Sequence, residues 1–412
     1  MNNFRLLSHA KMMARQALIR SMYGRERLTR AGSRNARPTP TQIKRVLVVR
    51  PDHLGDLLFA TPALERLRRA FPDLYITGLT GPWGRAMWEH NRSLDSIATL
   101  PFPGITASKE ANPLAPYGML GKSATSLKGA EYDLAVVLRF DHWWGAALMW
   151  LAEIPYRWGY NTPGMGAWLT HKAHYVPGRH EVEQNLRLVE EIINFMYGRA
   201  RVRRVGELEI DRERGIPALQ PPRPVTPEHE LPAGWLDTAK RAVIHPGTAA
   251  ANKLWTISGW AEVIDKLLGE GWAVALTGSP DERKLADAIF SAAEEQHGGQ
   301  GRNLSNLAGQ TANIAHLAGV LDKAHIVLGV DSGPLHIAAA LHKPTLHLYG
   351  PSDETIWGPW GDPRKHRAFR APGTHPTMHL EVGSPTLEGG PEMRAITPEM
   401  VWGEITALMR ET

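Results

Sequence analysis

The sequence contains no cysteine among its 412 residues. Disulfide bonds, cysteine zinc sites and thiol nucleophiles are therefore excluded, and the composition fits a reducing compartment. The sequence also has no stretch like the apolar core of a signal peptide, and no run near the roughly 20 apolar residues of a spanning helix. We therefore expect a cytoplasmic protein that is soluble or peripheral to a membrane.

The net positive charge of the chain is confined to one segment. Residues 1–40 hold nine Lys and Arg and one acid, Glu26, whereas the whole chain has a net charge of only +5. Apolar residues lie among these basic ones, so the arm has the composition of a basic amphipathic helix that rests on anionic lipid. A disordered, solvated arm explains the same composition equally well. We expect no nucleic-acid partner.

The length predicts two domains, because a single core stops growing well below 412 residues. Pro217 to Pro232 contains six prolines in sixteen residues, which is typical of an interdomain linker. The predicted parts are a basic arm (1–40), a first Rossmann-like domain (41–216), a Pro-rich linker (217–235), a second Rossmann-like domain (236–394) and a C-terminal helix (395–412).

Short apolar runs alternate with amphipathic segments on both sides of this linker, which predicts two α/β domains with parallel sheets. A long irregular segment is expected from Pro101 to Gly129, and a helix break near Pro62. The predicted strands are 44–50, 74–79, 94–100, 133–139, 157–161, 242–245, 272–277, 326–330 and 345–349. The predicted helices end near residues 69, 152, 196, 269, 295, 324, 341 and 410.

One of these units, Ile326 to Gly350, contains a strand, a helix and a second strand in 25 residues. Asp331 and Ser332 offer a helix cap, Gly333 allows close backbone approach, and Pro334 suits a first helical position. Such a turn points backbone N–H groups and the helix dipole at one spot, where a phosphate can bind. Since every doubly wound domain must turn from strand into helix, the pattern alone leaves a purely structural role equally open.

A second turn of this kind follows the first predicted strand, with Gly55 at the crossing and Asp56 at the helix start. Ligands of open parallel sheets bind beyond the carboxyl ends of the strands. We therefore expect Asp56 from one domain, and Lys253 with residues 331–336 from the other, to face a shared cleft. On charge alone, Asp56 is also explained as an acid that complements the helix dipole.

Several motifs, in one order over about 300 residues, resemble the heptosyltransferase-type glycosyltransferases of family 9. The resemblance runs from about Lys44 to Trp360. Its motifs are RPDHLGDLL with TPAL after it, RWGY at 157–160, HPGT followed by Lys253-Leu254-Trp255, GSPDE at 278–282, NLAG, DSGPLHIAAAL and YGPSD.

The resemblance implies a GT-B fold, with two facing Rossmann-like domains and an interdomain cleft. It also implies inverting transfer of a heptose from ADP-heptose to a lipid-linked acceptor, without an obligatory metal and without a cofactor. Asp56 matches the general base, and Lys253 matches a lysine that neutralises phosphate charge. The donor-binding residues implied by the motifs are Gly55, Thr248, Glu282, Asp331, Ser332, Gly333, Pro334, Leu335 and His336.

Structural roles stay open for several of these residues. Lys253 has the alternative of a solvated lysine, His336 of a helix-capping histidine, and Glu282 of an exposed acid at a helix start. Ala249 and Ala250 replace polar residues of several relatives, and 371–392 lacks the cysteines often found there, so the exact donor stays open.

The acceptor pocket does not follow from the motifs. We expect it near Arg139, Asp141 and His142, which are equally compatible with an ion pair and core packing. The implied acceptor is lipopolysaccharide core or a related glycan, at the inner face of the inner membrane. Two other functions stay open: a sugar-nucleotide 2-epimerase, which needs no acceptor, and a non-catalytic nucleotide-sugar binder, which needs no base.

Overall fold

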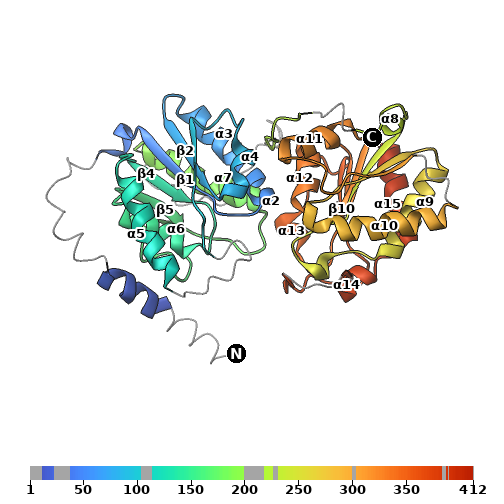
Figure 1. Ribbon diagram of the computed structural model, residues 1–412. Coiled ribbons are helices and arrows are strands. Elements are labelled where there is room, and N and C mark those ends of the chain that lie inside the picture. Colours follow the sequence, from blue (N-terminus) through green and yellow to red (C-terminus); the bar gives the residue numbers. More distant parts are fainter. Residues whose placement is uncertain are drawn as a thin grey trace. The chain divides into compact units, whose positions relative to one another are not determined.

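The computed structural model describes residues 12–22, 38–103, 114–198, 218–225, 231–298, 303–382, 387 and 389–411 (Figure 1). Most of the predicted basic arm (1–11 and 23–37) and part of the predicted linker (217 and 226–230) lie outside these ranges. Contacts divide the chain into two compact units, Met1–His53 with Phe59–Gly215, and Leu54–Leu58 with Ile216–Thr412. In the described ranges, every helix is too short or too polar to cross a bilayer.

The first unit is built on a six-stranded sheet in the order β3-β2-β1-β4-β5-β6, with all neighbours parallel. Apart from the half-buried Arg45, its two central strands consist of Val, Leu and Ala that are buried, as expected for a parallel sheet covered on both faces. Its strands are β1 (Arg45–Val49), β2 (Tyr75–Thr80), β3 (Ser96–Thr99), β4 (Leu134–Val137), β5 (Tyr156–Tyr160) and β6 (His171–Ala173).

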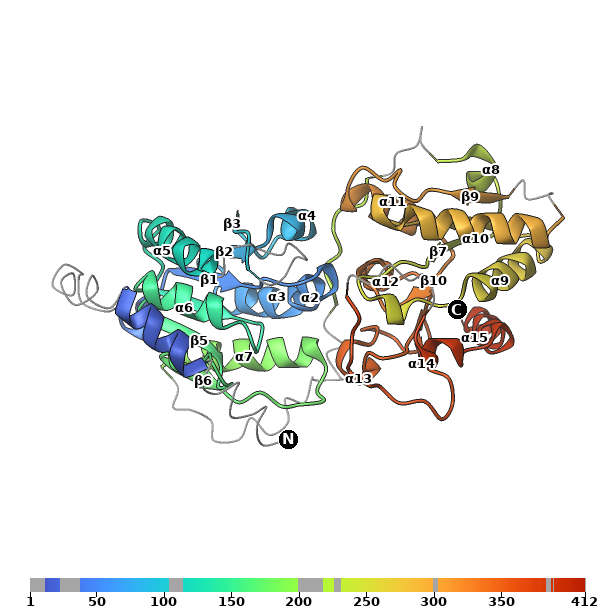
Figure 2. The same cartoon turned by 60° about the horizontal axis from the view of Figure 1, so that its bottom comes forward.

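Helices cover both faces of this sheet (Figure 2). Leu47 and Val49 of β1 belong to a core cluster with α5 and α6, while Val46 and Val48 point to the opposite face, where α3 packs against α7. The helices are α2 (Leu54–Phe59), α3 (Thr61–Ala70), α4 (Arg85–Trp88), α5 (Ala115–Lys128), α6 (Trp143–Leu151) and α7 (Glu181–Met196), with the 3₁₀ turns η1 (Pro40–Gln42) and η2 (Pro82–Gly84). The predicted helix break near Pro62 is confirmed, because α2 ends at Phe59 and a new helix, α3, begins after Ala60.

The prediction of an irregular segment up to Gly129 was wrong for its second half, where α5 forms. Its buried residues Leu120, Ala124 and Leu127 follow the helical spacing. Pro116 sits in the first turn, where its missing N–H has no partner to lose. Gly118 and Gly121 lowered the helix propensity of the sequence, and packing against α6 overrides that local preference.

Residues 12–22 form a helix that packs on the first unit. Ile19 is fully buried in the cluster that also contains Met165 and Trp168. The Arg15 guanidinium lies 4.1 Å from the centre of the Trp143 ring, within the range of a cation–π contact. One face of this helix therefore packs against protein. The described part of the arm is not fully solvated, and only part of its apolar surface is available to lipid.

The second unit repeats the architecture of the first. Its sheet has the order β12-β11-β10-β7-β8-β9, again with all neighbours parallel. Counted along the chain, both sheets have the order 3-2-1-4-5-6, which is the Rossmann order. The strands are β7 (Arg241–His245), β8 (Ala273–Leu276), β9 (Leu304–Asn306), β10 (Ile326–Val330), β11 (Thr345–Leu348) and β12 (His366–Phe369).

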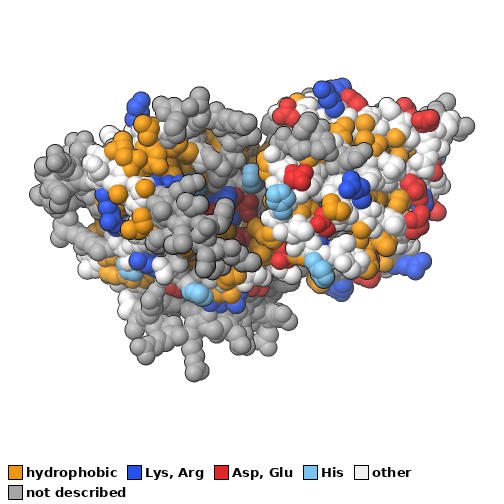
Figure 3. Space-filling view, turned by 90° about the horizontal axis from the view of Figure 1, so that it is seen from below, with side chains coloured by type: hydrophobic (Ala, Val, Ile, Leu, Met, Phe, Trp, Pro, Cys, Tyr) orange, Lys and Arg blue, Asp and Glu red, His pale blue; other side chains and the backbone are white. Residues whose placement is uncertain are grey.

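In this unit α9, α10 and α15 pack against one face of the sheet, while α11 packs against α12. The helices are α8 (Ala233–Leu236), α9 (Ile257–Gly269), α10 (Arg283–Gln296), α11 (Ile314–Lys323), α12 (Gly333–Ala340), α13 (Glu354–Trp357), α14 (Pro391–Arg394) and α15 (Pro398–Glu411), with the 3₁₀ turns η3 (Ala251–Lys253) and η4 (Pro280–Glu282). On the face seen in Figure 3, acidic and basic side chains of this unit are interspersed. This agrees with the concentration of basic charge in residues 1–40.

Candidate functional site

The strand order creates one switch point in each sheet, between β1 and β4 in the first unit and between β7 and β10 in the second. Loops that leave neighbouring strands in opposite directions open a crevice there, which is where ligands of such sheets bind. In the second unit, Thr248 and Lys253 follow β7 and residues 331–336 follow β10, so most of the predicted donor residues lie at this switch point.

Four of these residues contact one another. Lys253 Nζ lies 2.6 Å from Asp331 Oδ2, and His336 Nε2 lies 3.5 Å from Asp331 Oδ1. The Thr248 hydroxyl donates to the Asp331 carbonyl oxygen at 3.3 Å. Lys253 is therefore not the solvated lysine of the structural alternative, since its ammonium is held at the start of α12.

The Asp331 carboxylate is buried in this cluster. Burial on its own raises the pKa of Asp331, but the Lys253 ammonium and the His336 contact outweigh it and hold the pKa well below its usual range. Asp331 is thus ionised at neutral pH. Its carboxylate holds Lys253 by accepting from one of the three ammonium donors.

Ser332 is the N-cap of α12, as the sequence predicted, but its hydroxyl does not cap the helix. Among the described residues, the buried Ser332 Oγ has no hydrogen-bond partner. Pro334 occupies the first turn and contributes no N–H, so the Gly333 and Leu335 amides remain as donors at the positive end of the helix. A lysine, an unpartnered hydroxyl and a helix N-terminus are groups that an anion such as a diphosphate can bind.

His336 is buried, and its ring lies 5.1 Å from the ring of His347. His347 Nε2 lies 3.1 Å from Thr345 Oγ1, which also lies 3.2 Å from His366 Nδ1. Burial, reinforced by His336, holds the pKa of His347 well below 6.5. His347 is therefore a neutral polar support behind the cluster, not an acid or base at neutral pH.

Glu282 follows β8, and in the described part of the chain its contacts are with Ser279 and His245, away from the Lys253 cluster. Its carboxylate accepts the Ser279 backbone N–H at 2.7 Å, in a capping box. It also lies 3.9 Å from His245 Nε2, while burial lowers the pKa of His245 more than Glu282 raises it. A Cβ at Gly247 would lie 2.2 Å from Glu282 Oε1, so only glycine fits beside the carboxylate in its present place.

Gly55 and Asp56 lie in the first turn of α2, and contacts group residues 54–58 with the second unit. Gly55 is buried and Asp56 is half-buried. Within that unit, a Cβ at Gly55 would lie 3.1 Å from His336 Cδ2, tighter than ordinary van der Waals contact. The close approach explains why glycine precedes Asp56.

In the first unit, Arg139, Asp141 and His142 follow β4. Arg139 pairs with Asp141 at 2.7 Å and with Asp52 at 2.6 Å. His142 Nδ1 accepts the Gly145 N–H at the start of α6, and its ring packs edge-on against Phe102. The ion pair and the packing that the sequence left open as a structural role are both present.

Burial of His142, with the Arg139 cation beside it, lowers its pKa to about 3. Since Nδ1 accepts a hydrogen bond, the neutral ring carries its proton on Nε2. This buried Nε2 has no hydrogen-bond partner among the described residues. His142 is therefore a neutral donor at neutral pH.

Two features were not assigned from the sequence. Ser352, in the YGPSD motif after β11, is buried, and its hydroxyl has no partner in the described part of the chain. Arg370 holds this loop by donating to the Ser352 carbonyl oxygen at 2.5 Å. The sequence signal for Ser352 was its place shortly after β11, the strand next to β10 at the switch point. The other feature is the pair Arg50 and Asp52, which precedes Gly55 in the first motif.

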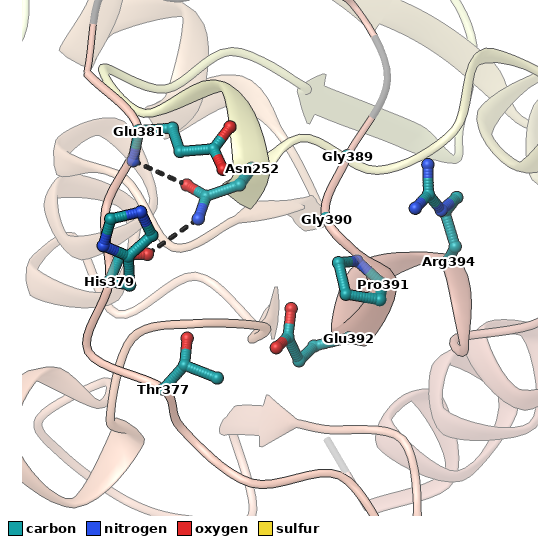
Figure 4. Close-up of a pocket in the computed structure, with 9 residues that line it drawn as sticks. All are labelled: Asn252, Thr377, His379, Glu381, Gly389, Gly390, Pro391, Glu392 and Arg394. Atoms are coloured by element: carbon teal, nitrogen blue, oxygen red, sulfur yellow. Dashed lines mark hydrogen bonds between the residues drawn. The ribbon is translucent and has the colours of Figure 1, made fainter.

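A cavity of about 420 Å³ lies in the second unit between residues 377–381 and α14. The Asn252 side chain donates to the His379 carbonyl at 2.7 Å and accepts the Glu381 N–H at 3.0 Å. In Figure 4 the Thr377 hydroxyl and the Glu392 carboxylate point toward the centre of the cavity. None of the predicted site residues lines it, but Asn252 joins its wall to Lys253, the next residue in the chain.

Solved structures share this fold along nearly the whole chain. The Escherichia coli ADP-heptose LPS heptosyltransferase II matches with a TM-score of 0.65 at 21% identity, covering 89% of this chain and 99% of that one. A family 9 glycosyltransferase from Veillonella parvula matches with a TM-score of 0.65 at 19% identity, covering 92% and 100%. The fold class is GT-B, with two Rossmann-like domains.

The sequence comparisons define the family. The model of glycosyltransferase family 9 (heptosyltransferase) matches residues 120–379, more than half of the chain. Lipopolysaccharide heptosyltransferase 3 of E. coli K12 is 28% identical over 312 residues, or 74% of this chain and 82% of that protein. Lipopolysaccharide heptosyltransferase 1 of Pseudomonas aeruginosa is 26% identical over 332 residues, or 78% and 83%. The chain belongs to glycosyltransferase family 9 and is a glycosyltransferase, as its motifs predicted.

Proposed function

We propose that this enzyme transfers a heptose from ADP-heptose to a lipopolysaccharide core or a related lipid-linked glycan, with inversion at the anomeric carbon. The observation that carries the proposal is the anion site at the start of α12, where Lys253 lies 2.6 Å from Asp331 beside the unpartnered Ser332 hydroxyl. The nature of the donor and of the acceptor is supported by the named relatives, which are lipopolysaccharide heptosyltransferases.

In this proposal the second unit holds the donor. Lys253, Ser332 and the backbone N–H groups of Gly333 and Leu335 bind the diphosphate, and Thr248 lies at the edge of that site. Ionised Asp331 and His336 orient Lys253 and accept or donate to sugar hydroxyls, while Glu282 binds the ribose. Pro334 fixes the first turn of the helix. The lysine and the helix dipole stabilise the leaving diphosphate, so no metal ion is required.

Asp56 is the proposed general base. Its carboxylate removes the proton of the acceptor hydroxyl as that oxygen bonds to the anomeric carbon and the bond from that carbon to the ADP oxygen breaks. ADP leaves with the electron pair of the broken bond, and Asp56 later releases its proton to water. Positioning of the two reactants and stabilisation of the leaving group together lower the barrier.

Arg139, Asp141 and His142 are proposed to line the acceptor side. Asp141 has about half of its side chain exposed, and the Arg139 side chain is 27% exposed, so both retain surface for a polar acceptor. The His142 Nε2–H is a donor without a described protein partner. A glycan offers hydroxyl and carboxylate oxygens to such groups.

We further propose that the protein works on the cytoplasmic side of the inner membrane, bound peripherally through its basic arm. The helix at 12–22 exposes Met13, Leu18 and Met22, while Ile19 anchors it to protein. The arm as a whole is strongly basic, which favours anionic lipid. Full-length protein should sediment with phosphatidylglycerol vesicles at low salt and less so at 0.5 M salt, whereas a chain starting at Thr41 should not. Equal binding by both chains would remove the membrane proposal.

Calorimetry with ADP-heptose, ADP, UDP-sugars and GDP-sugars tests the donor. We expect ADP-heptose to bind most tightly and to release ADP only when a lipopolysaccharide-core acceptor is added. A preference for a UDP- or GDP-sugar would move the function to another donor. Nucleotide release at an equal rate without any acceptor would contradict transfer and favour an isomerase or hydrolase.

A further inference from the structure

Arg50 is the residue that follows β1, and it is an arginine with only 1% of its surface exposed. Its guanidinium contacts Asp52 at 3.1 Å, Glu181 at 3.0 Å and Asn185 Oδ1 at 3.2 Å. Glu181 and Asn185 lie one turn apart on α7. A buried charge is tolerated only where it is paired and hydrogen-bonded, and three polar side chains meet this need for Arg50.

The contacts of Arg50 reach both ends of α2. On the N-terminal side, the Asp52 carboxylate forms ion pairs with Arg50 and Arg139, and its Oδ1 accepts the His53 N–H at 3.2 Å. The Trp83 indole N–H donates to the Asp52 carbonyl oxygen at 2.9 Å. The residues directly before α2 are therefore fixed by side chains from separate elements.

The C-terminal end of α2 is held through the same centre. Asn185, which is fully buried, accepts from Arg50 with its oxygen and donates with its Nδ2 to the Phe59 carbonyl oxygen at 3.2 Å. Phe59 is the last residue of α2. The helix is six residues long and Asp56 lies in its first turn, so a six-residue element is tied at both ends to Arg50.

The choice of arginine has a physical reason. Its planar guanidinium offers donors in fixed directions, which lets one group bind Asp52, Glu181 and Asn185 at once. A lysine at this position keeps the charge but has a single compact ammonium and cannot reproduce the fork. The buried Arg50 guanidinium is paired with the buried carboxylates of Asp52 and Glu181, and Arg139, which also binds Asp52, pairs with the more exposed Asp141.

We propose that Arg50, together with Asp52 and Asn185, positions α2 so that the Asp56 carboxylate meets the acceptor hydroxyl. The inference rests on the proposed role of Asp56 as general base. Arg50 does not touch the reacting atoms, and it acts through the placement of Asp56. Since a misplacement of about 1 Å at a reacting group lowers rates by about 100-fold, loss of this support reduces turnover and leaves donor affinity unchanged.

The test compares Arg50→Lys with Arg66→Lys as a matched control. Both arginines pair with a glutamate of α7, but the Arg66–Glu190 pair is on the surface, with 43% of the Arg66 side chain exposed. We expect Arg50→Lys to lower kcat by about 30- to 100-fold, with ADP-heptose affinity within twofold of the unchanged enzyme. Arg66→Lys should change neither quantity by more than twofold. Asn185→Ser, which loses the contact to Phe59, serves as a second variant where Arg50→Lys fails to fold.

A double-mutant cycle with Asp56→Asn separates positioning from general loss of structure. In the Asp56→Asn background, Arg50→Lys should have no further effect on kcat, because the group that it positions is gone. Equal fold-losses in both backgrounds, or kcat unchanged by Arg50→Lys and Asn185→Ser in otherwise intact enzyme, would overturn the positioning role. Full turnover of Asp56→Asn itself would instead refute the proposed base, so the two failures are distinguishable.

Discussion

The two switch points use the same strand order but treat their polar groups differently. At the first, between β1 and β4, Asp52 binds both Arg50 and Arg139, Arg50 also pairs with Glu181, and Arg139 also pairs with Asp141. At the second, between β7 and β10, Lys253 and Asp331 pair, but the adjacent Ser332 hydroxyl has no partner in the described chain. The first arrangement fixes the loop before α2. The second has a polar group that is available to a ligand.

This difference agrees with different roles for the two switch points. A satisfied network holds the turn that leads to Asp56, where a base needs a fixed geometry. The second switch point has a buried hydroxyl without a described partner, and a buried polar group without a partner lowers stability. Ligand binding should therefore stabilise the second unit, and substitutions in the two sites should have distinguishable effects on affinity and stability.

The largest effect is expected for Lys253→Ala. Donor affinity should fall by about 100-fold, since a hydrogen bond to a charged group contributes about 1.5–3 kcal/mol. Removal of the ammonium also takes the lysine partner from the buried Asp331 carboxylate, which should cost about 3–5 kcal/mol of unfolding free energy. Calorimetry and urea unfolding measure the two effects.

Lys266→Ala is the matched control for this prediction, because Lys266 also pairs with an acid, Glu262 of α9, but both side chains are about one third exposed. It should change stability by less than about 0.5 kcal/mol and leave donor affinity intact. If Lys253→Ala behaves like Lys266→Ala, the second switch point is not the donor site.

The next effect concerns His142 in the first unit. Its pKa is about 3 in the native protein, so between pH 6.5 and pH 3 only the unfolded chain takes up its proton. Stability from His142 is therefore complete above pH 6.5 and falls as the pH drops. At pH 5 the loss is about 2 kcal/mol, at 1.36 kcal/mol per pKa unit.

His142→Asn removes this dependence. Urea unfolding at pH 7 and pH 5 should show that the unchanged protein loses about 2 kcal/mol more than the variant over this interval. From pH 7 to pH 8 the two curves should run parallel, because His142 is neutral in both states. Parallel curves down to pH 5 would show that His142 is not held neutral in the folded protein.

The smallest effects come from two hydroxyls in the second unit. Ser332→Ala should lower ADP affinity by about fivefold and cause no loss of stability, since its buried hydroxyl has no described partner to lose. Thr256→Ala should do the reverse, because the Thr256 hydroxyl accepts the Gly259 N–H as the N-cap of α9, a contact that contributes about 1 kcal/mol. Thermal unfolding with and without ADP compares the two. A stability loss in Ser332→Ala as large as that in Thr256→Ala would show that Ser332 is a structural cap.

Much of the fold could be predicted from the sequence, because the central strands are continuous apolar runs. The edge strands β6, β9 and β12 were missed, since His171–Ala173, Leu304–Asn306 and His366–Phe369 carry polar residues and only three or four positions each. Edge strands are half-exposed and lack the apolar signal of central ones. Helix α5 was missed because its glycines lower the helix propensity of that segment.

The candidate site divides similarly. Motif order brought Thr248, Lys253, Asp331 and His336 into one group, and the structure places them in mutual contact. The Arg50 network was not predicted, because Glu181 and Asn185 lie more than 130 residues from Arg50 and no local pattern joins them. The role of Asp56 also cannot be read from the fold alone, since both a base and a dipole-complementing acid belong at a helix start.

Asp56→Asn tests the central claim most directly. The variant should keep the affinity for ADP-heptose within twofold by calorimetry, because the second unit holds the donor, and should lose at least 100-fold in the rate of acceptor-dependent ADP release. The amide keeps the shape of the side chain but cannot accept the proton. Turnover equal to that of the unchanged enzyme would contradict the assignment of the base to the first switch point.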